Sequence, residues 1–448
     1  MNNLEKIFYL TVSFLFLVLG YVFNKGIFFH QSQLWLLFIS WLFLFIPLIK
    51  KRFIYFNFEL NFKNILFLIT FIIFILFYFF DGGIYFLSKQ GEANLILLKF
   101  LALLFFCFYL FNFHFFKRNV FTGFLIHLKR HKFIYLIILA LALRLLVLFY
   151  SPMPKIDVFW FSDGAAESFL QGDNPYSQTY FKVYEDQDYV NNFFAYWPVT
   201  IFVASFFKLF FGDVRFAYIF CQMVTALLAY LLVKKVFNQK KIIAELITLL
   251  LLYTPLSLFV IEQTWVEPLM VLLIYLFVWF WLIGKKTIAS FVLGLFLGVK
   301  QLGLMIGIFI TRLNSFKLKQ ILITFFVLLI IIVPFILWQP IDFFNDTIAE
   351  HFLSNKIFFH SLSFNSLWNV YFYSSIPAWF YLPVLLILFL WLWFKSKKNL
   401  FGVIYAGVFF LFSLFLLRQS FLNYYWGISQ LIILLIIGEL RLINKKHV

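Results

Sequence analysis

Long runs of apolar side chains recur along almost the whole chain, and they constrain its fold more than any other feature. Most runs are about 17–20 residues long, which as helix is enough to cross the hydrocarbon core of a membrane. We expect such spans at 7–23, 32–49, 64–80, 94–115, 132–150, 215–233, 242–261, 268–283, 319–338, 378–394, 400–417 and 425–441. A shorter pair, 287–299 and 302–311, is expected to form two half-length or tilted helices that meet at Lys300 and Gln301.

The composition supports this interpretation and excludes a soluble protein. Hydrophobic residues make up 64% of the 448 residues and charged residues only 12%, so too few polar side chains exist to cover a soluble surface. Only helices or closed barrels satisfy the backbone inside a lipid bilayer, and these runs have the length of helices. The sequence therefore predicts an all-α polytopic membrane protein with about 12–14 transmembrane segments.

The basic residues indicate how the spans are oriented. The chain has 36 Lys and Arg against 19 Asp and Glu, which gives a net charge of +17. Short basic clusters separate the apolar runs at 50–52, 117–118, 129–132, 234–235, 240–241, 285–286, 395–398 and 445–446. This distribution follows the positive-inside rule and predicts that both termini are cytoplasmic. Nucleic acid is not needed as a partner to explain the charge.

Polarity divides the chain into three parts. Residues 1–116 are expected to form a four-helix transmembrane module that is nearly free of polar groups. Residues 117–131 would be a cytoplasmic connector, and 132–448 would be the catalytic transmembrane core. Two long external loops, 151–214 and 339–377, interrupt this core, and long loops more often carry function than scaffolding.

The first external loop contains two expected helices. Residues 164–171 have helical composition, and Gly172 with Asn174 and Pro175 should end that helix. Residues 198–211 are apolar but short for a span, which predicts a helix in or dipping into the outer membrane interface.

Asp157 is the leading candidate for a catalytic residue. It follows the 132–150 span by a few residues, at the height of a lipid headgroup, where a carboxylate can take a proton from a sugar hydroxyl. The alternative is that Asp157 only solvates the loop. Asp163 is its competitor, although its position predicts that it caps the 164–171 helix.

Other acidic and histidine residues give only weak metal signals. Glu185, Asp186 and Asp188 have the carboxylate spacing of a metal–nucleotide-sugar motif, but such a cluster is more often a solvated face. His351 and His360 show no metal-ligand spacing. We therefore expect no cofactor, and a divalent metal has no support from the sequence.

Three cations stand where charge is unfavourable, at Arg144, Lys300 and Arg418. For Arg144, a structural ion pair or snorkelling toward an interface explains the charge as well as a function does. Lys300 is flanked by glycines and is expected to point at the same external cavity as Asp157. Two cations, Lys300 and Arg418, facing one carboxylate would suit a lipid-linked phosphate leaving group.

Hydrogen-bonding and aromatic residues near these cations complete the expected site. For any single tyrosine the interfacial aromatic belt is the more common explanation, and Glu267 is first explained by the positive end of the helix that Pro268 begins, with a sugar contact secondary. With these alternatives stated, the predicted substrate-binding residues are Asp163, Tyr176, Tyr196, Glu267, Lys300, Gln301, Arg418, Asn423 and Tyr424.

Several of these elements together resemble the GT-C superfamily of membrane glycosyltransferases, in particular bacterial polyprenol-phosphate-mannose mannosyltransferases. The resemblance covers roughly residues 132–441. It rests on an Arg-bearing helix before Asp157, then Ala165-Ala166, Leu170, Gly172, Asn174-Pro175-Tyr176, Tyr196-Trp197-Pro198, Lys300-Gln301 and Asn423-Tyr424-Tyr425. The segment Tyr196-Trp197-Pro198 departs from the family's pattern, because it is only a loose version of its Tyr-x-Pro element.

The resemblance implies a GT-C-like helical bundle with interfacial helices in the large external loop. It also implies a hexosyltransferase that moves one sugar, most simply a mannose-like hexose, from a polyprenyl-phosphate-sugar donor lipid. The acceptor would be a hydroxyl of a glycan or lipid-linked molecule on the external face of a bacterial plasma membrane. Asp157 would be the catalytic base, and membrane lipids would be the other partners.

Two alternatives stay open at this stage. A polymerase or ligase acting on lipid-linked polysaccharide shares the long external loops and the lipid-phosphate leaving group. A polytopic transporter fits the broken helix pair at Lys300, although no internal repeat is visible and the polar residues gather externally.

Overall fold

The computed structural model describes residues 3–24, 29–49, 62–110, 122–183, 192–353 and 361–441. Within these residues the chain forms α-helices, short 3₁₀ and π turns, and no strand. Ten helices are long and apolar enough to cross a membrane, and three shorter apolar helices accompany them. The prediction of an all-α polytopic membrane protein is therefore confirmed.

The described helices follow one another along the chain in the order below. The first half contains α1 (Asn3–Val22), α2 (Gln31–Ile49), α3 (Phe62–Phe79), α4 (Lys89–Leu110), α5 (Thr122–Tyr150), α6 (Asp157–Gln171), η1 (Pro175–Ser177), α7 (Pro198–Phe211), α8 (Phe216–Leu231) and η2 (Leu232–Val236). The second half contains α9 (Lys241–Leu252), α10 (Ser257–Glu262), α11 (Glu267–Leu282), α12 (Lys286–Leu297), α13 (Gly303–Ile310), α14 (Leu318–Trp338), α15 (Pro340–Phe344), η3 (Asn345–Leu353), α16 (Phe364–Phe372), α17 (Ala378–Lys395), α18 (Leu400–Leu417) and α19 (Leu422–Leu440).

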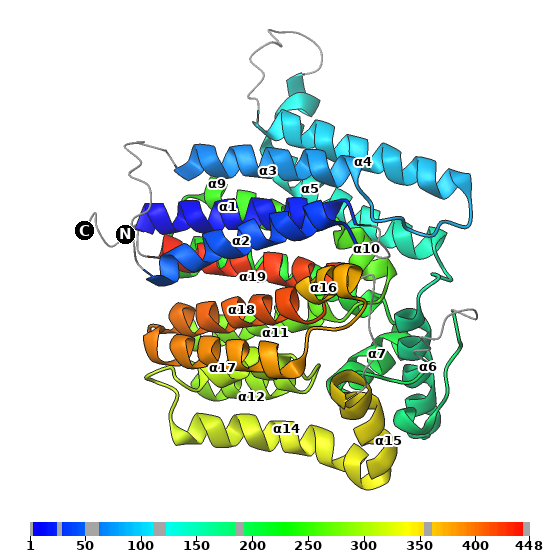
Figure 1. Ribbon diagram of the computed structural model, residues 1–448. Helices are drawn as coiled ribbons and strands as arrows, with labels where there is room; N and C mark the ends of the chain where they lie inside the picture. Colours follow the sequence, from blue (N-terminus) through cyan, green and yellow to red (C-terminus); the bar gives the residue numbers. More distant parts are fainter. Residues whose placement is uncertain are drawn as a thin grey trace.

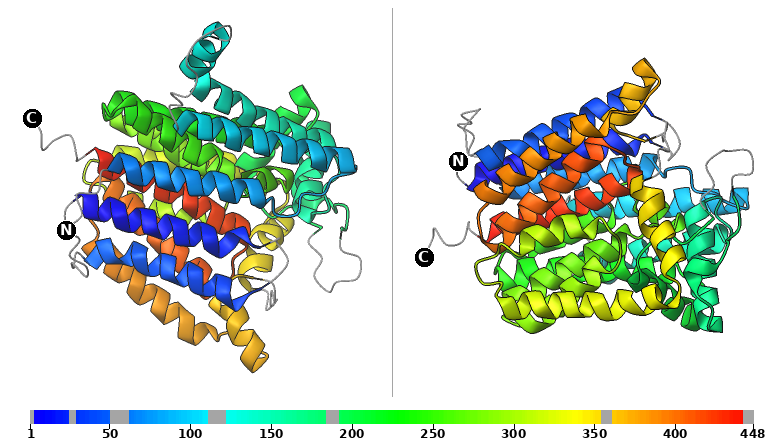
Figure 2. Two further views of the ribbon diagram at one scale, coloured as in Figure 1. Left: turned by 90° about the horizontal axis from the view of Figure 1, so that it is seen from above. Right: turned by 60° about the horizontal axis from the view of Figure 1, so that its bottom comes forward.

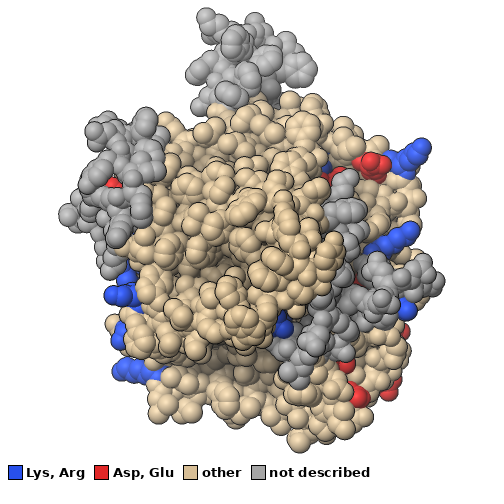
Figure 3. Space-filling view, viewed as in Figure 1, with Lys and Arg blue, Asp and Glu red and all other residues tan. Residues whose placement is uncertain are grey.

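The long helices lie roughly side by side and share one general direction (Figure 1). Both termini lie at one end of this bundle, and α6, α7 and α15 lie at the other end in each view (Figures 1 and 2). Charged side chains gather toward these two ends, whereas the middle of the visible surface is nearly free of charge (Figure 3). This distribution is typical of a bundle whose middle is surrounded by hydrocarbon.

The first four helices pack on the remainder of the bundle as two pairs. α1 and α2 lie against α18 and α19, where Trp41 Nε1 donates to Ser413 Oγ over 2.7 Å. α3 and α4 lie against α5 and α9, where the Tyr109 hydroxyl donates to Glu245 Oε2 over 2.7 Å. Residues 1–116 therefore have extensive contacts with the remainder of the chain, and their treatment as a separate module stays a prediction.

Some helix limits match the expected ones and others do not. α7 begins at Pro198 and ends at Phe211, as predicted. α6 ends at Gly172, whose φ of 90° is accessible to glycine at little steric expense, but it begins at Asp157 rather than at residue 164. α5 begins at Thr122, so part of the expected connector 117–131 is helical.

The prediction of one continuous span over 242–261 was wrong, because this segment forms two helices, α9 and α10. Pro255 lies at the break, and Leu256 has a left-handed φ of 65°. A break inside a membrane bundle frees backbone carbonyls that must find other donors. Arg144 supplies one of them, since its Nη2 donates to the Leu252 carbonyl over 2.7 Å.

Arg144 is fully buried and also bonds a side chain on α8. Its Nε and Nη2 donate to Gln222 Oε1 over 2.9 and 2.8 Å, and Gln222 Nε2 donates to the Ser257 carbonyl over 3.1 Å. Arg144 thus neither snorkels to an interface nor depends on an ion pair for these contacts. It connects α5 and α8 to both sides of the α9–α10 break.

Candidate functional site

The segment between α12 and α13 is attached to the end of the long loop 151–214. Trp197 N donates to the Val299 carbonyl, and Val199 N donates to the Gly298 carbonyl, each over 3.1 Å. The Thr200 hydroxyl adds a third bond to the Val299 carbonyl over 3.1 Å. The start of α7 therefore supplies donors for the two carbonyls that directly follow α12.

Gln301 extends this attachment to the second long loop, 339–377. Its Nε2 donates to the Ala195 carbonyl over 3.3 Å and also to the Thr347 carbonyl in η3. A side-chain amide that bonds two loop carbonyls holds the loops at a defined distance from the helix bend. Gln301 therefore connects three chain segments, which its sequence position alone did not indicate.

Lys300 lies at the centre of the candidate site. It is 6% exposed, and its Nζ lies 3.1 Å from Glu267 Oε1 at the start of α11. Its ammonium also lies 4.2 Å from the ring centre of Tyr424 and 5.2 Å from that of Tyr196. Asn423 Nδ2 donates to Glu267 Oε2 over 2.9 Å. The structure thus brings together five residues that the sequence predicted separately.

Two buried polar atoms on residues next to this cluster in the chain or bonded to it lack a partner among the described residues. They are Asn423 Oδ1, on the side chain that bonds Glu267, and Trp197 Nε1, on the residue after Tyr196. Buried polar groups in native proteins are nearly always hydrogen-bonded, so an orphaned acceptor and an orphaned donor are unusual.

A groove of about 420 Å³ opens beside Lys300 and is lined by α13, α17, α18 and the start of α19. One part of its wall is polar, formed by Lys300, Gln301, Arg418, Gln419 and Tyr424. The remainder is apolar and includes Met305, Leu382, Leu385, Leu386, Phe389, Phe410 and Leu414.

The groove reaches the outer surface of the bundle on the side of α17. Leu382 and Leu386 line it and are 54% and 58% exposed. In a membrane these side chains would face lipid, so a lipid could enter sideways without leaving the bilayer. Lys300, Gln301, Arg418 and Tyr424 line this groove, whereas Asp157, which the sequence predicted to face the same cavity as Lys300, is not among its lining residues.

Asp157 is the first residue of α6 and is 8% exposed. Its Oδ1 accepts a hydrogen bond from Val158 N over 2.8 Å. Burial raises the pKa of the Tyr196 phenol well above its usual value, and the charges of Glu267 and, least of all, Asp157 act in the same direction.

Asp163 has a different position from the one expected. It lies inside α6 and is not the cap of a helix, because α6 begins six residues earlier. Its Oδ2 lies 2.8 Å from Lys208 Nζ, which also pairs with Glu167 Oε2 at 2.7 Å. Burial raises the pKa of Asp163, and the bond to Lys208 opposes this shift. Asp163 therefore joins α6 to α7.

Tyr176 holds the backbone of Tyr196 in place. It is 2% exposed, and its hydroxyl donates to the Tyr196 carbonyl over 2.9 Å. Asn174 Oδ1 accepts from Tyr176 N over 3.0 Å and caps η1. The sequence predicted Tyr176 to bind substrate, whereas the hydrogen bond of its hydroxyl is to the backbone that carries Tyr196.

Arg215, which the sequence did not single out, connects the two ends of the long loop 151–214. Its side chain is 1% exposed, pairs with Asp213 at 2.6 Å, and donates from Nη1 to the Ser151 carbonyl over 2.6 Å. The guanidinium also lies 4.9 Å from the ring centre of Phe159 in α6. A cation two residues after Asp213, at the start of an apolar span, was the available signal.

The structure does not describe the remaining candidates. Glu185, Asp186, Asp188 and His360, and the side chain of His351, lie outside the described residues. Within the described residues no three His, Cys, Asp or Glu side chains gather as a metal site would require. Comparison with family models, curated proteins and solved structures gives no match for this chain.

Proposed function

We propose that this protein is a membrane glycosyltransferase that moves a single hexose from a polyprenyl-phosphate donor to an acceptor hydroxyl. The groove beside Lys300 is the observation that carries the proposal. Its polar end holds two cations, Lys300 and Arg418, and its apolar part is lined by residues of α13, α17 and α18. A prenyl chain ending in a phosphate has the same division between an apolar body and an anionic head.

The phosphate would lie between Lys300 and Arg418. An ammonium has three donors, of which Glu267 and the Tyr424 hydroxyl engage two of those of Lys300, so one would remain for a phosphate oxygen. The contacts to Glu267 and to the rings of Tyr196 and Tyr424 hold the ammonium in place. A cation fixed in this way stabilises the charge of the departing phosphate without having to reorganise.

The sugar would occupy the space between the phosphate and the external loops. Asn423 Oδ1 and Trp197 Nε1 provide an acceptor and a donor for its hydroxyl groups. The rings of Tyr196 and Tyr424 beside them offer apolar faces. A mannose-like hexose is the simplest sugar that meets this chemistry.

The reaction is a single displacement at the anomeric carbon. The acceptor hydroxyl oxygen forms a bond to that carbon, Asp157 takes the hydroxyl proton, and the bond from carbon to the phosphate oxygen breaks. Polyprenyl phosphate leaves with the bonding electron pair and needs no proton. One carboxylate is therefore sufficient, in contrast to a glycosidase, which uses two.

The test is transfer of radiolabelled sugar in proteoliposomes from a panel of polyprenyl-phosphate sugars to glycan and lipid acceptors. The variant is Asp157→Asn, and the matched control is Asp173→Asn, an exposed carboxylate just beyond α6. Transfer should fall by about 100-fold or more in Asp157→Asn, the usual consequence of losing a general base, and should be unchanged in Asp173→Asn.

Each alternative outcome has a definite meaning. Full activity of Asp157→Asn would show that Asp157 is not the catalytic base. Transfer of preassembled chains rather than single sugars would favour a polymerase or ligase. Sugar movement across the vesicle membrane without formation of a new glycosidic bond would contradict the enzyme and favour a transporter.

A further inference from the structure

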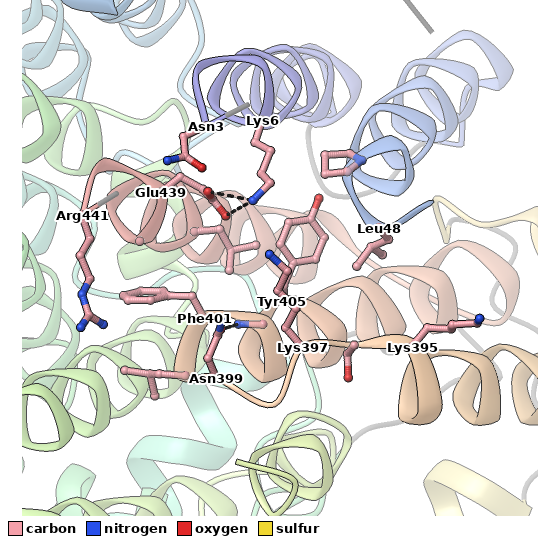
Figure 4. A pocket seen from close by; sticks show the side chains of 16 residues that line it. Asn3, Lys6, Leu48, Lys395, Lys397, Asn399, Phe401, Tyr405, Glu439 and Arg441 are labelled. Atoms are coloured by element: carbon pink, nitrogen blue, oxygen red, sulfur yellow. Dashed lines mark hydrogen bonds and ion pairs between the residues drawn. The ribbon is translucent and has the colours of Figure 1, made fainter. Parts of the chain in front are cut away.

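A second cavity lies at the opposite end of the bundle from the Lys300 groove. It has a volume of about 370 Å³ and lies among the ends of α1, α2, α17, α18 and α19 (Figure 4). All five helices are candidate membrane spans, so their ends mark the height of lipid headgroups. Its wall carries several charged side chains.

Four cations line this cavity, namely Lys6, Lys395, Lys397 and Arg441. Among the described residues of the wall Glu439 is the one carboxylate, and Lys6 Nζ lies 3.2 Å from it. Lys395 and Arg441 have no carboxylate within ion-pair distance among the described residues. The cavity therefore has a net positive charge that the described part of the protein does not neutralise.

Two helix N-termini add to this field. α1 begins at Asn3 and α18 begins at Leu400, and both residues line the cavity. The first N–H groups of a helix lack partners inside the helix, and the helix dipole makes this end positive. At α18, Asn399 Oδ1 accepts from Gly402 N over 2.8 Å and leaves other donors of the first turn available. Such ends bind anions readily.

The C-termini of α2, α17 and α19 also meet this cavity, and the negative ends of their dipoles oppose the two N-termini. At α19 the Leu440 carbonyl accepts a hydrogen bond from Gln239 Nε2 over 2.9 Å, and Arg441 follows directly. The positive charge of the cavity therefore comes from its side chains, because the cations outnumber the carboxylates among the described residues of its wall.

The cavity also has an apolar part that a free anion would not use. Pro47, Leu48, Phe401 and Leu435 form this part of the wall, beside the cations. A phosphodiester joined to a glycerol and acyl chains would contact both parts. Basic pockets between transmembrane helices at this height are suited to anionic lipid headgroups.

We propose that this cavity binds a phosphate group, and that its source is the headgroup of an anionic phospholipid in the leaflet next to the two termini. The site is separate from the Lys300 groove and independent of the proposed sugar transfer. Its function is to bind a structural lipid that holds α1 and α2 against α17, α18 and α19.

The experiment measures lipid binding to the full chain in nanodiscs. Wild type is compared with the triple variant Lys395→Gln, Lys397→Gln, Arg441→Gln, whose substituted side chains are exposed. The matched control is Lys240→Gln, Lys285→Gln, Lys319→Gln, which removes three exposed lysines that do not line the cavity. The probe lipids are phosphatidylglycerol and phosphatidylcholine, and inorganic phosphate is titrated in a separate arm with lipid-free detergent.

We expect wild type and control to prefer phosphatidylglycerol over phosphatidylcholine and the triple variant to bind it at least about tenfold more weakly. The basis is that each basic residue near the surface contributes several-fold to anionic lipid affinity. Equal binding of both lipids by wild type, or unchanged binding by the triple variant, would overturn the site. Saturation by inorganic phosphate without any lipid preference would overturn the assignment to a lipid headgroup.

Thermal unfolding provides a second measurement. Phosphatidylglycerol should raise the unfolding temperature of wild type and of the control but not that of the triple variant, because a ligand stabilises the folded state that binds it. The same rise in all three proteins would show that the effect is not due to this cavity, and would contradict the proposal.

Discussion

Lys300 Nζ lies 3.1 Å from Glu267 Oε1, and the two side chains are each 7% exposed. The residues are 33 positions apart, one at the helix bend between α12 and α13 and the other at the start of α11. A buried pair of this kind is only weakly stabilising as a whole, but removal of one partner leaves the other as an uncompensated charge. The proposed site therefore depends on both members.

The first prediction concerns the stability of this pair. Glu267→Leu should lower the free energy of unfolding by about 3–5 kcal/mol, because Lys300 is left charged and buried. The double variant Glu267→Leu with Lys300→Met should recover a substantial part of this loss. The free energy of unfolding of wild type, both single variants and the double variant is measured in mixed detergent micelles. Lys241→Met is the control, because that side chain is 68% exposed. Equal losses in the single and double variants would contradict the pairing.

The second prediction concerns the charge that faces the donor phosphate. Lys300→Met should reduce sugar transfer by about 100-fold or more, the effect of removing one preorganised charge-stabilising donor. Lys300→Arg should retain part of the activity, since it keeps the cation but not the geometry. Transfer assays at saturating donor separate this effect from binding. Equal activity of the Met and Arg variants would mean that the charge does not act on the leaving group.

The third prediction concerns the apolar part of the groove. Met305→Trp should fill the space between α13 and α17 and raise KM for a long-chain polyprenyl donor, while a donor with a short prenyl chain is affected less. Leu322→Trp is the control, because Leu322 is 57% exposed on α14 and does not line the groove. The measurement is the KM of wild type and both variants for the long-chain and the short-chain donor. An equal rise for both donors would place the prenyl chain elsewhere.

The fourth prediction concerns Arg144 and the break between α9 and α10. Arg144→Leu removes donors from the Leu252 carbonyl and from Gln222, and each unsatisfied buried acceptor costs about 1–3 kcal/mol. We expect a clear drop in the unfolding temperature, with Arg130→Gln, an exposed position on the same helix, as control. A drop no larger than that of the control would show that water satisfies these acceptors.

Apolar periodicity and punctuation residues predicted most of the helices. The ranges 198–211 and 400–417 match α7 and α18 residue for residue, and Gly172 ends α6 as expected. These features depend on nearby residues, because helix length and termination follow from apolar runs, proline and glycine. Pro255 was also visible in the sequence as a residue that can end a helix. The helix break at this position also needs a donor for the Leu252 carbonyl, and the structure shows that Arg144 supplies it.

The side-chain partners could not be predicted in the same way. Asp163 looked like a helix cap, yet it pairs with Lys208, and Tyr176 looked like a substrate contact, yet it bonds the Tyr196 backbone. Both pairings join segments that are distant in sequence, and the rotation of each helix about its axis decides which side chains meet. The sequence does not specify that rotation.

The sequence by itself determined that this chain is an all-α multi-pass membrane protein with its polar residues near the helix ends, because the cost of exposing polar backbone and charge to lipid leaves few other folds. Only the tertiary structure decided that Lys300, Glu267, Asn423, Tyr196 and Tyr424 form one cluster beside an apolar groove. The physical reason is that a cluster requires several helix ends to meet at one depth, and packing across the whole bundle sets that depth.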